Sequence, residues 1–513
     1  MKSRSKKSIW NLSTALVYKL LVIAVGLILP KLFLQNYGME IHGLQSSVKQ
    51  FFVYIALLEA GVGTATLQSL YKPVVQDDRA QINAYLSAAS RYYNRIGFVY
   101  FGALVILSVV YALVVPVDGM TLVPVMLYVL VSGAVTGFEF FYVSKVRLLL
   151  KATGEQYWLN GITTLTFLIS SALKIYLIWQ SVPIVLVECV FLLIHLLFFL
   201  AYWLLIKRKY PWLSLRAKPD YSGMEQKNAV LVHRITSVVF LNIDVVLLTL
   251  LCDLKTVSIY AMYKMVMNMV SSILAELTGS FQFLLGQQFN GEEDEQKPRY
   301  CRMVDMLHVY YSAVAFAVYT VTYLLILPFL RIYTSGLEYD FIFPILPVFY
   351  IVMEFLMVGR EMMLRTIDVA GHFRKTQGRA IAETVLNLVF SILFVVLGYR
   401  HFGPVGGICG VLGGTILALL YRTLDINHYV NRKIFGRRAW KTNGVMLVNL
   451  ILFVAVAFGF RYIPLSITNY AQFVLHGCWI TAATLLLFLL VQSLVNRREW
   501  AYLLAYVKAK RRK

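Results

Sequence analysis

Charged residues are scarce in this 513-residue sequence. They make up 14% of it, whereas a soluble protein usually carries about 25%. Apolar residues gather instead in long runs such as ILFVAVAFGF (451–460) and TAATLLLFLLVQSLV (481–495). Runs of about 20 apolar residues match the thickness of a bilayer core. The composition excludes an ordinary soluble domain and predicts an all-α polytopic membrane protein.

Cysteine is also rare, and its placement excludes further classes. The five cysteines form no CxxC pair and mostly fall in apolar segments, which argues against a zinc site or a disulfide framework. We recognise no nucleophile–base set, metal-ligand cluster or phosphate-binding loop, so we expect neither an enzyme nor a bound metal. The run GPVGGICGVLGG (403–414) lacks the Gly-Lys-Ser/Thr of a nucleotide loop. The GxxxG spacing of Gly406, Gly410 and Gly414 predicts close helix packing instead.

Acidic residues are outnumbered by basic ones, 26 against 48, and the net charge is +22. In a soluble chain this excess would indicate nucleic-acid binding. Here the basic residues are spread over many separate loops and ends, for example KRK (207–209), NRKIFGRR (431–438) and KAKRRK (508–513). Cytoplasmic loops of membrane proteins collect Lys and Arg in this way. We therefore expect no nucleic-acid partner.

Fourteen membrane spans are predicted from the apolar segments. They are 9–34, 44–70, 94–116, 119–145, 157–180, 182–206, 228–251, 256–286, 305–330, 341–368, 379–399, 404–430, 443–461 and 466–496. The first is too long for a signal peptide and lacks a small-residue cleavage site, so we interpret it as a retained helix.

The distribution of positive charge orients these spans. With the N-terminus in the cytoplasm, the predicted outside loops hold only Lys31, Lys255, Arg331, Arg400 and Arg461. One missed helix would invert every later loop, so this bias supports the span count and places both termini in the cytoplasm. All predicted outside loops are too short to fold into an extracytoplasmic domain.

A weak repeat divides the chain. Lys19 and Lys49 are separated by the same interval as Arg234 and Lys264, and six predicted helices lie between the two copies. This pattern indicates two six-helix halves of parallel orientation, a known transporter design. We predict an N-lobe at 1–227, a C-lobe at 228–441 and an appendage of helices 13–14 with a basic tail at 442–513.

These four cations, Lys19, Lys49, Arg234 and Lys264, lie within predicted spans, where a charge is costly. Either each pairs with a neighbouring acid, or together they line a cationic cavity that binds a phosphate or diphosphate. The second interpretation is favoured because the cations occur on corresponding helices of both halves. Lys174 lies near the predicted outer end of its helix, where we expect its amine to extend to the membrane surface.

Two acids, Glu59 and Asp244, also lie within predicted spans. Each is either the buried counter-ion of a cation or a carboxylate that takes part in gating or ion coupling. Gly61 and Gly63 follow Glu59 and predict a hinge in helix 2, because glycine weakens a helix by about 1 kcal/mol.

A polar stripe marks predicted helix 11. Glu383, Asn387 and Ser391 recur at every fourth residue and so share one face. Such a face lies against a neighbouring helix or a cavity, not against lipid.

Three stretches together carry a family resemblance: NYGMEIHGLQSSVKQFFVYIALLEAGVGTATLQSLYKPVVQDD (36–78), HRITSVVFLNIDVVLLTLLCDLKTVSIYAMYK (233–264) and GHFRKTQGRAIAETVLNLVFSILFVVLG (371–398). They resemble the polysaccharide-export flippases, the Wzx-like branch of the multidrug/oligosaccharidyl-lipid/polysaccharide exporter superfamily. The resemblance implies two six-helix lobes in a V with alternating access. It also implies transport of undecaprenyl-diphosphate-linked oligosaccharides from the inner to the outer leaflet of the bacterial cytoplasmic membrane.

The resemblance assigns substrate binding to Lys19, Lys49 and Lys264, which fall on helices that carry cavity cations in related lipid II flippases. Arg234 is added from the repeat alone. The expected partners are the lipid-linked glycan, membrane lipid and the polysaccharide polymerase machinery. A monomer is favoured, and coupling to the membrane potential, H⁺ or Na⁺ takes the place of a cofactor.

Other functions remain open. A flippase for lipid II or a teichoic-acid precursor is one, although the lipid II branch more often has arginine in its cavity. A drug or cation exporter of the same superfamily usually has twelve helices and an acidic binding lobe. A glycan polymerase or ligase needs a large outer loop, and a membrane scaffold has no need of intramembrane lysines.

Overall fold

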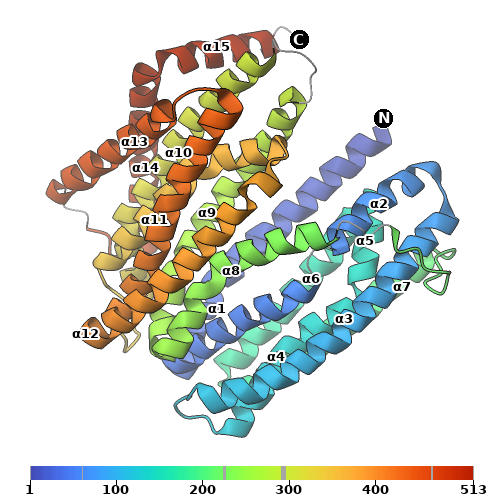
Figure 1. The fold of residues 1–513 in the computed structure, drawn as a ribbon. Helices are drawn as coiled ribbons and strands as arrows, with labels where there is room; N and C mark the ends of the chain where they lie inside the picture. The colour runs from blue at the N-terminus through green and yellow to red at the C-terminus, as the bar shows by residue number, and fades with distance from the viewer. Residues whose placement is uncertain (1, 60–61, 223–226, 290–295, 464–465, 512–513) are drawn as a thin grey trace. The chain divides into compact units, whose positions relative to one another are not determined.

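The computed structural model describes residues 2–59, 62–222, 227–289, 296–463 and 466–511, except for some side chains within these ranges. Its first half contains α1 (Lys2–Ala56), η1 (Leu57–Glu59), α2 (Val62–Gln76), α3 (Arg79–Val114), α4 (Leu122–Tyr142), α5 (Ser144–Ala152), α6 (Gln156–Trp179), α7 (Ile184–Lys209) and α8 (Lys227–Leu251). Its second half contains α9 (Leu254–Phe289), α10 (Gln296–Tyr333), α11 (Ile345–Val369), α12 (Phe373–Tyr429), η3 (Val430–Phe435), α13 (Trp440–Gly459), η4 (Phe460–Tyr462), α14 (Tyr470–Val495) and α15 (Arg497–Arg511). Figure 1 shows these helices along the chain.

Each of the fourteen predicted spans falls on a helix. Ten helices among the described residues are long and apolar enough to cross a membrane. Helix α12 contains two predicted spans joined at a sharp bend, and α1 contains the first span and, beyond a similar bend, the first part of the second, which continues into α2. Helix α8 and the charge-bearing α11 provide two further spans. The prediction of an all-α polytopic membrane protein is confirmed.

Glycine makes both bends. Gly38 in α1 has φ 81°, and Gly403 in α12 has φ 61°. Residues with a Cβ rarely adopt this left-handed region, so glycine is the residue that turns the chain there without steric cost. In each case helix resumes immediately beyond the bend.

The chain separates into two compact units, Met1–Ser258 and Ile259–Lys513. The contacts of α8 are with α1, η1 and α2, so packing groups this helix with unit 1, whereas the sequence assigned it to the C-lobe that begins at residue 228. The predicted lobes are bodies that move during transport, and contacts in one structure do not test that division.

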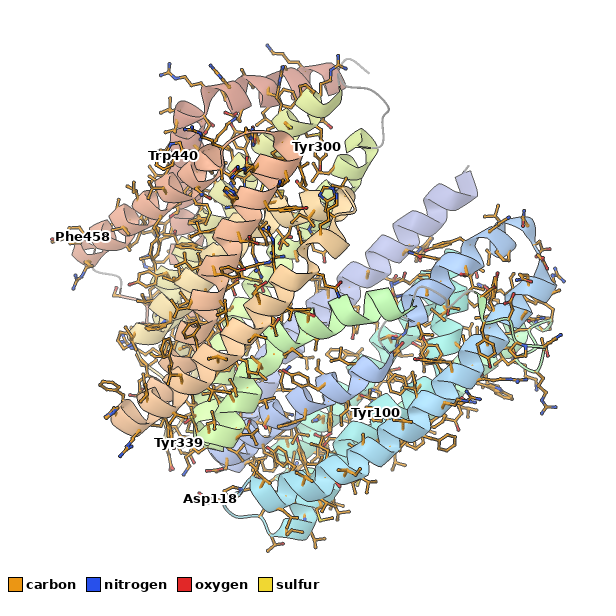
Figure 2. All side chains as sticks on the ribbon, in the orientation of Figure 1. Tyr100, Asp118, Tyr300, Tyr339, Trp440 and Phe458 are labelled. Atoms are coloured by element: carbon orange, nitrogen blue, oxygen red, sulfur yellow. The ribbon has the colours of Figure 1, made fainter. Side chains whose placement is uncertain are left out.

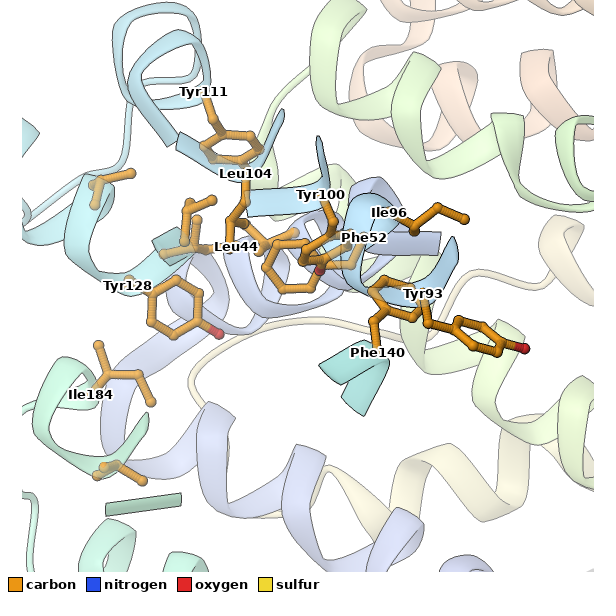
Figure 3. Close-up of a cluster of buried hydrophobic side chains, with 14 of the residues drawn as sticks. Leu44, Phe52, Tyr93, Ile96, Tyr100, Leu104, Tyr111, Tyr128, Phe140 and Ile184 are labelled. Atoms are coloured by element: carbon orange, nitrogen blue, oxygen red, sulfur yellow. The ribbon is translucent and has the colours of Figure 1, made fainter. Parts of the chain in front are cut away.

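Aromatic and aliphatic side chains from α1 to α7 and from the start of α9 form the core of unit 1, and Figure 3 shows part of it. Tyr100 of α3 packs edge-on against Phe140 of α4 with ring centroids 5.4 Å apart, and its hydroxyl donates to the carbonyl of Gly133 at 3.0 Å. A Cβ at Gly133 would lie 2.4 Å from a methyl carbon of Leu104 and 2.8 Å from the ring of Phe52. The absence of a side chain at Gly133 therefore lets α3 and α4 approach closely.

Helix α10 is the central helix of unit 2 and packs against α11, α13, α14 and α15. In the most apolar 18-residue stretch of α10, 61% of the residues are buried, whereas in that of α13 11% are buried. Trp440 and Phe458 project from α13 near its two ends (Figure 2), and their side chains are 80% and 56% exposed. Such broad apolar exposure is typical of a helix that faces lipid.

The two halves of α12 pack directly on each other after the bend at Gly403. A Cβ at Gly406 would lie 2.1 Å from the carbonyl oxygen of Gly398, and a Cβ at Gly410 would lie 2.3 Å from that of Phe394. Gly414 approaches the backbone of Ser391 in the same way. The predicted close packing of this glycine series is confirmed: the glycines let the backbones of a helical hairpin touch.

Candidate functional site

The cations predicted to bind substrate differ in their surroundings. Lys49 lies on the second half of α1 with an exposed side chain, and within the described residues no acid forms an ion pair with it. Lys19, on the first half of α1, is half-buried and makes an interaction of its own. The side chain of Arg234 lies outside the described part of the chain. Lys49 is therefore the predicted cation with the clearest access to an anion.

Polar contacts hold the segment of α1 that carries Lys49. Gln50 donates to Asn242 of α8 at 2.5 Å, and Thr249 of α8 donates to Ser47 at 2.8 Å. The hydroxyl of Tyr111 on α3 also donates to Ser47, at 3.0 Å. Hydrogen bonds on both sides thus fix the orientation of this helix, which keeps Lys49 in a defined position.

Lys264 lies on α9 in unit 2 and is half-buried. Its amine is 5.8 Å from the ring centroid of Tyr260, within the range of a cation–π contact. It also interacts electrostatically with Glu354 of α11, a buried carboxylate that accepts a hydrogen bond from Tyr319 at 2.7 Å. Sequence reasoning did not single out Glu354, because no spacing along the chain relates α9 to α11.

Glu59 is the last residue of η1, between α1 and α2. Helix α1 ends at Ala56, η1 covers 57–59, and α2 begins at Val62, so the expected single span 44–70 is two helices. Glu59 accepts a hydrogen bond from Tyr93 at 3.1 Å, and a Cβ at Gly63 would lie 3.1 Å from the same hydroxyl. Close packing thus explains Gly63. Gly61 lies outside the described residues, and the hinge stays a prediction.

The charges nearest to Glu59 come from α5, a short helix that was not predicted. Arg147 and Lys151 of α5 interact electrostatically with Glu59, and Arg147 also pairs with Glu139 at 3.4 Å. We expect Glu59 to pair with a cavity lysine in one state and to release it in another, and this stays a prediction. Asp244 of α8, the second predicted acid, is 3% exposed and makes an interaction of its own.

Lys174 does not extend to the surface, contrary to the prediction. Its amine forms an ion pair with Glu188 of α7 at 2.6 Å, and the two side chains are 8% and 5% exposed. The amine also lies 4.7 Å from the ring centroid of Phe191. Because α7 runs back along α6, Glu188 is placed where it can neutralise Lys174, which removes the reason to extend into solvent.

The polar stripe of α12 pairs across the α12 hairpin. Asn387 donates to Thr415 at 3.0 Å, and Ser391 donates to the carbonyl of Val411 at 3.3 Å. Glu383 forms ion pairs with the buried guanidinium of Arg422, 3.3 Å from its Nε, and with Arg360 of α11. The expectation that this face lies against a neighbour instead of lipid is confirmed.

This ladder continues toward the ends of the hairpin that lie farthest from Gly403. Arg422 also pairs with Asp425 at 2.9 Å, and Asp425 pairs with Arg379 at 2.5 Å. Sequence reasoning overlooked Arg360 and Arg422 because both lie near the predicted inner ends of their spans. The fourth-residue spacing from Arg379 to Glu383 was the signal that extends the stripe.

No protein-family model matches the chain, and no curated protein matches it in sequence. Among solved structures, the lipid II flippase MurJ in an inward closed conformation has a TM-score of 0.62 at 12% identity, covering 96% of this chain and 99% of its own. An inward-facing multidrug resistance MATE family transporter of the MOP superfamily has a TM-score of 0.61 at 16% identity, covering 82% and 98%. This chain therefore has the fold of these transporters.

Proposed function

We propose that this protein is a flippase that moves undecaprenyl-diphosphate-linked oligosaccharide units from the inner to the outer leaflet of the bacterial cytoplasmic membrane, for export of a cell-surface polysaccharide. The observation that carries the proposal is the match in fold to a lipid II flippase over 96% of the chain. The match to the MATE transporter covers 82%. A flippase fold thus accounts for more of the chain than an exporter fold does.

The lysines supply the chemistry that a diphosphate headgroup requires. Lys49 is exposed and has no ion-pair partner among the described residues, so a charge within a predicted span is left to be neutralised by a ligand. Lys264 keeps its amine between an aromatic ring and a buried carboxylate. We propose that both bind the diphosphate, with Lys19 and Arg234 in supporting roles.

The membrane potential favours transport in the proposed direction. The substrate headgroup carries about two negative charges, and moving them outward across an inside-negative membrane releases roughly 4–5 kcal/mol per 100 mV. The lysines offset part of this charge while the complex is loaded, and the same potential draws the unloaded lysines back inward. Turnover should therefore accelerate with an imposed potential, and an unchanged rate after the potential is collapsed would contradict this account.

The decisive experiment measures transport of a short-chain diphosphate-linked glycan between leaflets of proteoliposomes under an imposed potential. We expect Lys49→Ala with Lys264→Ala to lower the rate at least tenfold. Lys72→Ala with Lys433→Ala is the matched control, because it also removes one lysine from each unit, both are exposed, and neither has an ion-pair partner in the described part of the chain. This control should transport at the wild-type rate.

Each other result revises the proposal in a defined way. Equal transport by both variants would keep the flippase and make Lys49 and Lys264 structural. No transport of any diphosphate-linked glycan would favour the drug or cation exporter that the MATE similarity suggests, and small cations would then be tested. Transport of lipid II or a teichoic-acid precursor in preference to an oligosaccharide unit would change the substrate but not the reaction.

Glu59 provides a narrower test. The variant Glu59→Gln keeps an acceptor for the hydroxyl of Tyr93 but removes the charge. If Glu59 gates the cavity or couples an ion, transport by this variant should lose its dependence on pH or sodium. Unchanged transport with unchanged ion dependence would leave Glu59 as a packing residue of η1.

A further inference from the structure

A cavity of about 360 Å³ lies in unit 1, among α3, the junction of α4 with α5, the end of α7 and the segment 210–215 that follows it. These elements can be followed in Figure 1. The lining combines aliphatic residues such as Leu86 and Leu213 with Tyr142, Trp203 and two lysines, Lys145 and Lys207. A mostly apolar cavity with two lysines in its lining suits a ligand that has both an apolar part and a negative charge.

The two lysines that line the cavity differ from their basic neighbours. Arg147 pairs with Glu139, and Lys209 pairs with Glu155. Within the described residues neither Lys145 nor Lys207 forms an ion pair: Lys145 donates to the hydroxyl of Ser90 at 3.3 Å, and Lys207 lies 4.9 Å from the ring centroid of Trp203. Both lysines that line the cavity thus lack an ion-pair partner among the described residues.

The position along α7 indicates where in a bilayer the cavity lies. Leu193, Leu197, Leu200 and Leu204 form one exposed apolar stripe, with exposures of 47–67%. Trp203, 52% exposed, follows at the end of this stripe, and the basic run 207–209 comes next. Tryptophan followed by Lys and Arg marks the headgroup level of the cytoplasmic leaflet. The cavity therefore opens where lipid phosphates lie.

We propose that this cavity binds one anionic phospholipid of the inner leaflet, with its phosphate on Lys145 and Lys207 and an acyl chain along the leucine stripe of α7. Basic pockets between membrane helices on the cytoplasmic side bind lipid headgroups by this chemistry. A bound lipid would connect α7 to α5, the helix whose cations interact with Glu59. The site is separate from the lysines assigned to the transported substrate, so it does not depend on the proposed function.

The test is native mass spectrometry of the delipidated full chain titrated with phosphatidylglycerol or phosphatidylcholine in detergent. We expect one phosphatidylglycerol to bind more tightly than phosphatidylcholine. Lys145→Ala with Lys207→Ala should weaken that first binding step about thirty-fold, since each lysine near the surface contributes roughly fivefold to anionic-lipid binding. The control Arg432→Ala with Lys433→Ala removes two exposed charges from unit 2 and should leave the affinity unchanged.

A second variant separates charge from space. Leu213→Trp fills the cavity while both lysines remain, and it should also abolish the first binding step. Wild-type affinity in either cavity variant, an equal loss in the control, or equal binding of phosphatidylcholine would overturn the proposal. Competition by inorganic phosphate would show a soluble-anion site, and preferential displacement by the diphosphate-linked glycan would assign the cavity to the transported substrate. Thermal unfolding of each variant confirms that it is folded.

Discussion

Two helical hairpins, one in each unit, handle buried charge in different ways. In unit 1, α6 and α7 carry one deeply buried ion pair, Lys174 with Glu188, close to their connecting turn. In unit 2, the α12 hairpin carries a ladder of ion pairs. Glu383 pairs with Arg360 and Arg422, and Asp425 pairs with Arg379 and Arg422. The isolated pair joins one cation to one acid, whereas in the ladder each carboxylate pairs with two arginines and Arg422 pairs with both carboxylates.

The difference concerns stability and also the availability of cations for a ligand. Both arrangements neutralise their own arginines and lysines inside one unit. Lys49 has no such arrangement among the described residues and is exposed. Among the described residues, the structural contacts thus separate the intramembrane cations that join helices through ion pairs from Lys49, which forms none.

The largest loss of stability is expected from breaking the ion pair between Lys174 and Glu188. The variant Glu188→Leu leaves the amine of Lys174 buried without its counter-ion and should destabilise the protein by about 3–5 kcal/mol. Adding Lys174→Leu should restore most of that loss, because a buried pair can be replaced by apolar residues at little cost. Unfolding titrations with SDS in mixed micelles would measure both. If Glu188→Leu alone is tolerated, then Lys174 reaches water after all.

A smaller loss of stability is expected from weakening the ladder of ion pairs in unit 2. Glu383→Gln removes a charge but keeps hydrogen-bonding atoms near Arg360 and Arg422, and Arg422 still pairs with Asp425. We expect a loss of about 1.5–3 kcal/mol, the range for hydrogen bonds to charged groups. The same titration applies. A loss as large as that of Glu188→Leu would show that the ladder does not share its charges.

The smallest effect should come from the exposed end of the ladder. The side chain of Arg379 is 40% exposed, so water screens its pair with Asp425. Arg379→Ala should cost about 0–1 kcal/mol. High salt should lower the stability of the wild type by a similar amount and leave the variant unaffected. A larger loss would mean that the contact of Arg379 with the ring of Tyr429 also stabilises this end.

Much of this protein followed from local pattern. Long apolar runs predict membrane helices because a bilayer admits few other structures, and the predicted spans all fall on helices. Fourth-residue spacing placed Glu383, Asn387 and Ser391 on one face, and glycine spacing predicted the close helix packing that the structure shows within α12. Each of these features depends on residues that are neighbours in sequence or on the lipid bilayer, which surrounds every membrane helix in the same way.

What the tertiary structure decided is which charges meet. The sequence showed that Lys174 and Arg360 carry charge, but only the packing of α7 on α6 and of α12 on α11 identifies their partners. The same packing created the cavity beside Lys145 and Lys207 from segments far apart in sequence. An ion pair forms when two atoms approach within about 4 Å, and in a folded chain that distance is set by helix packing, which spacing along the sequence does not encode.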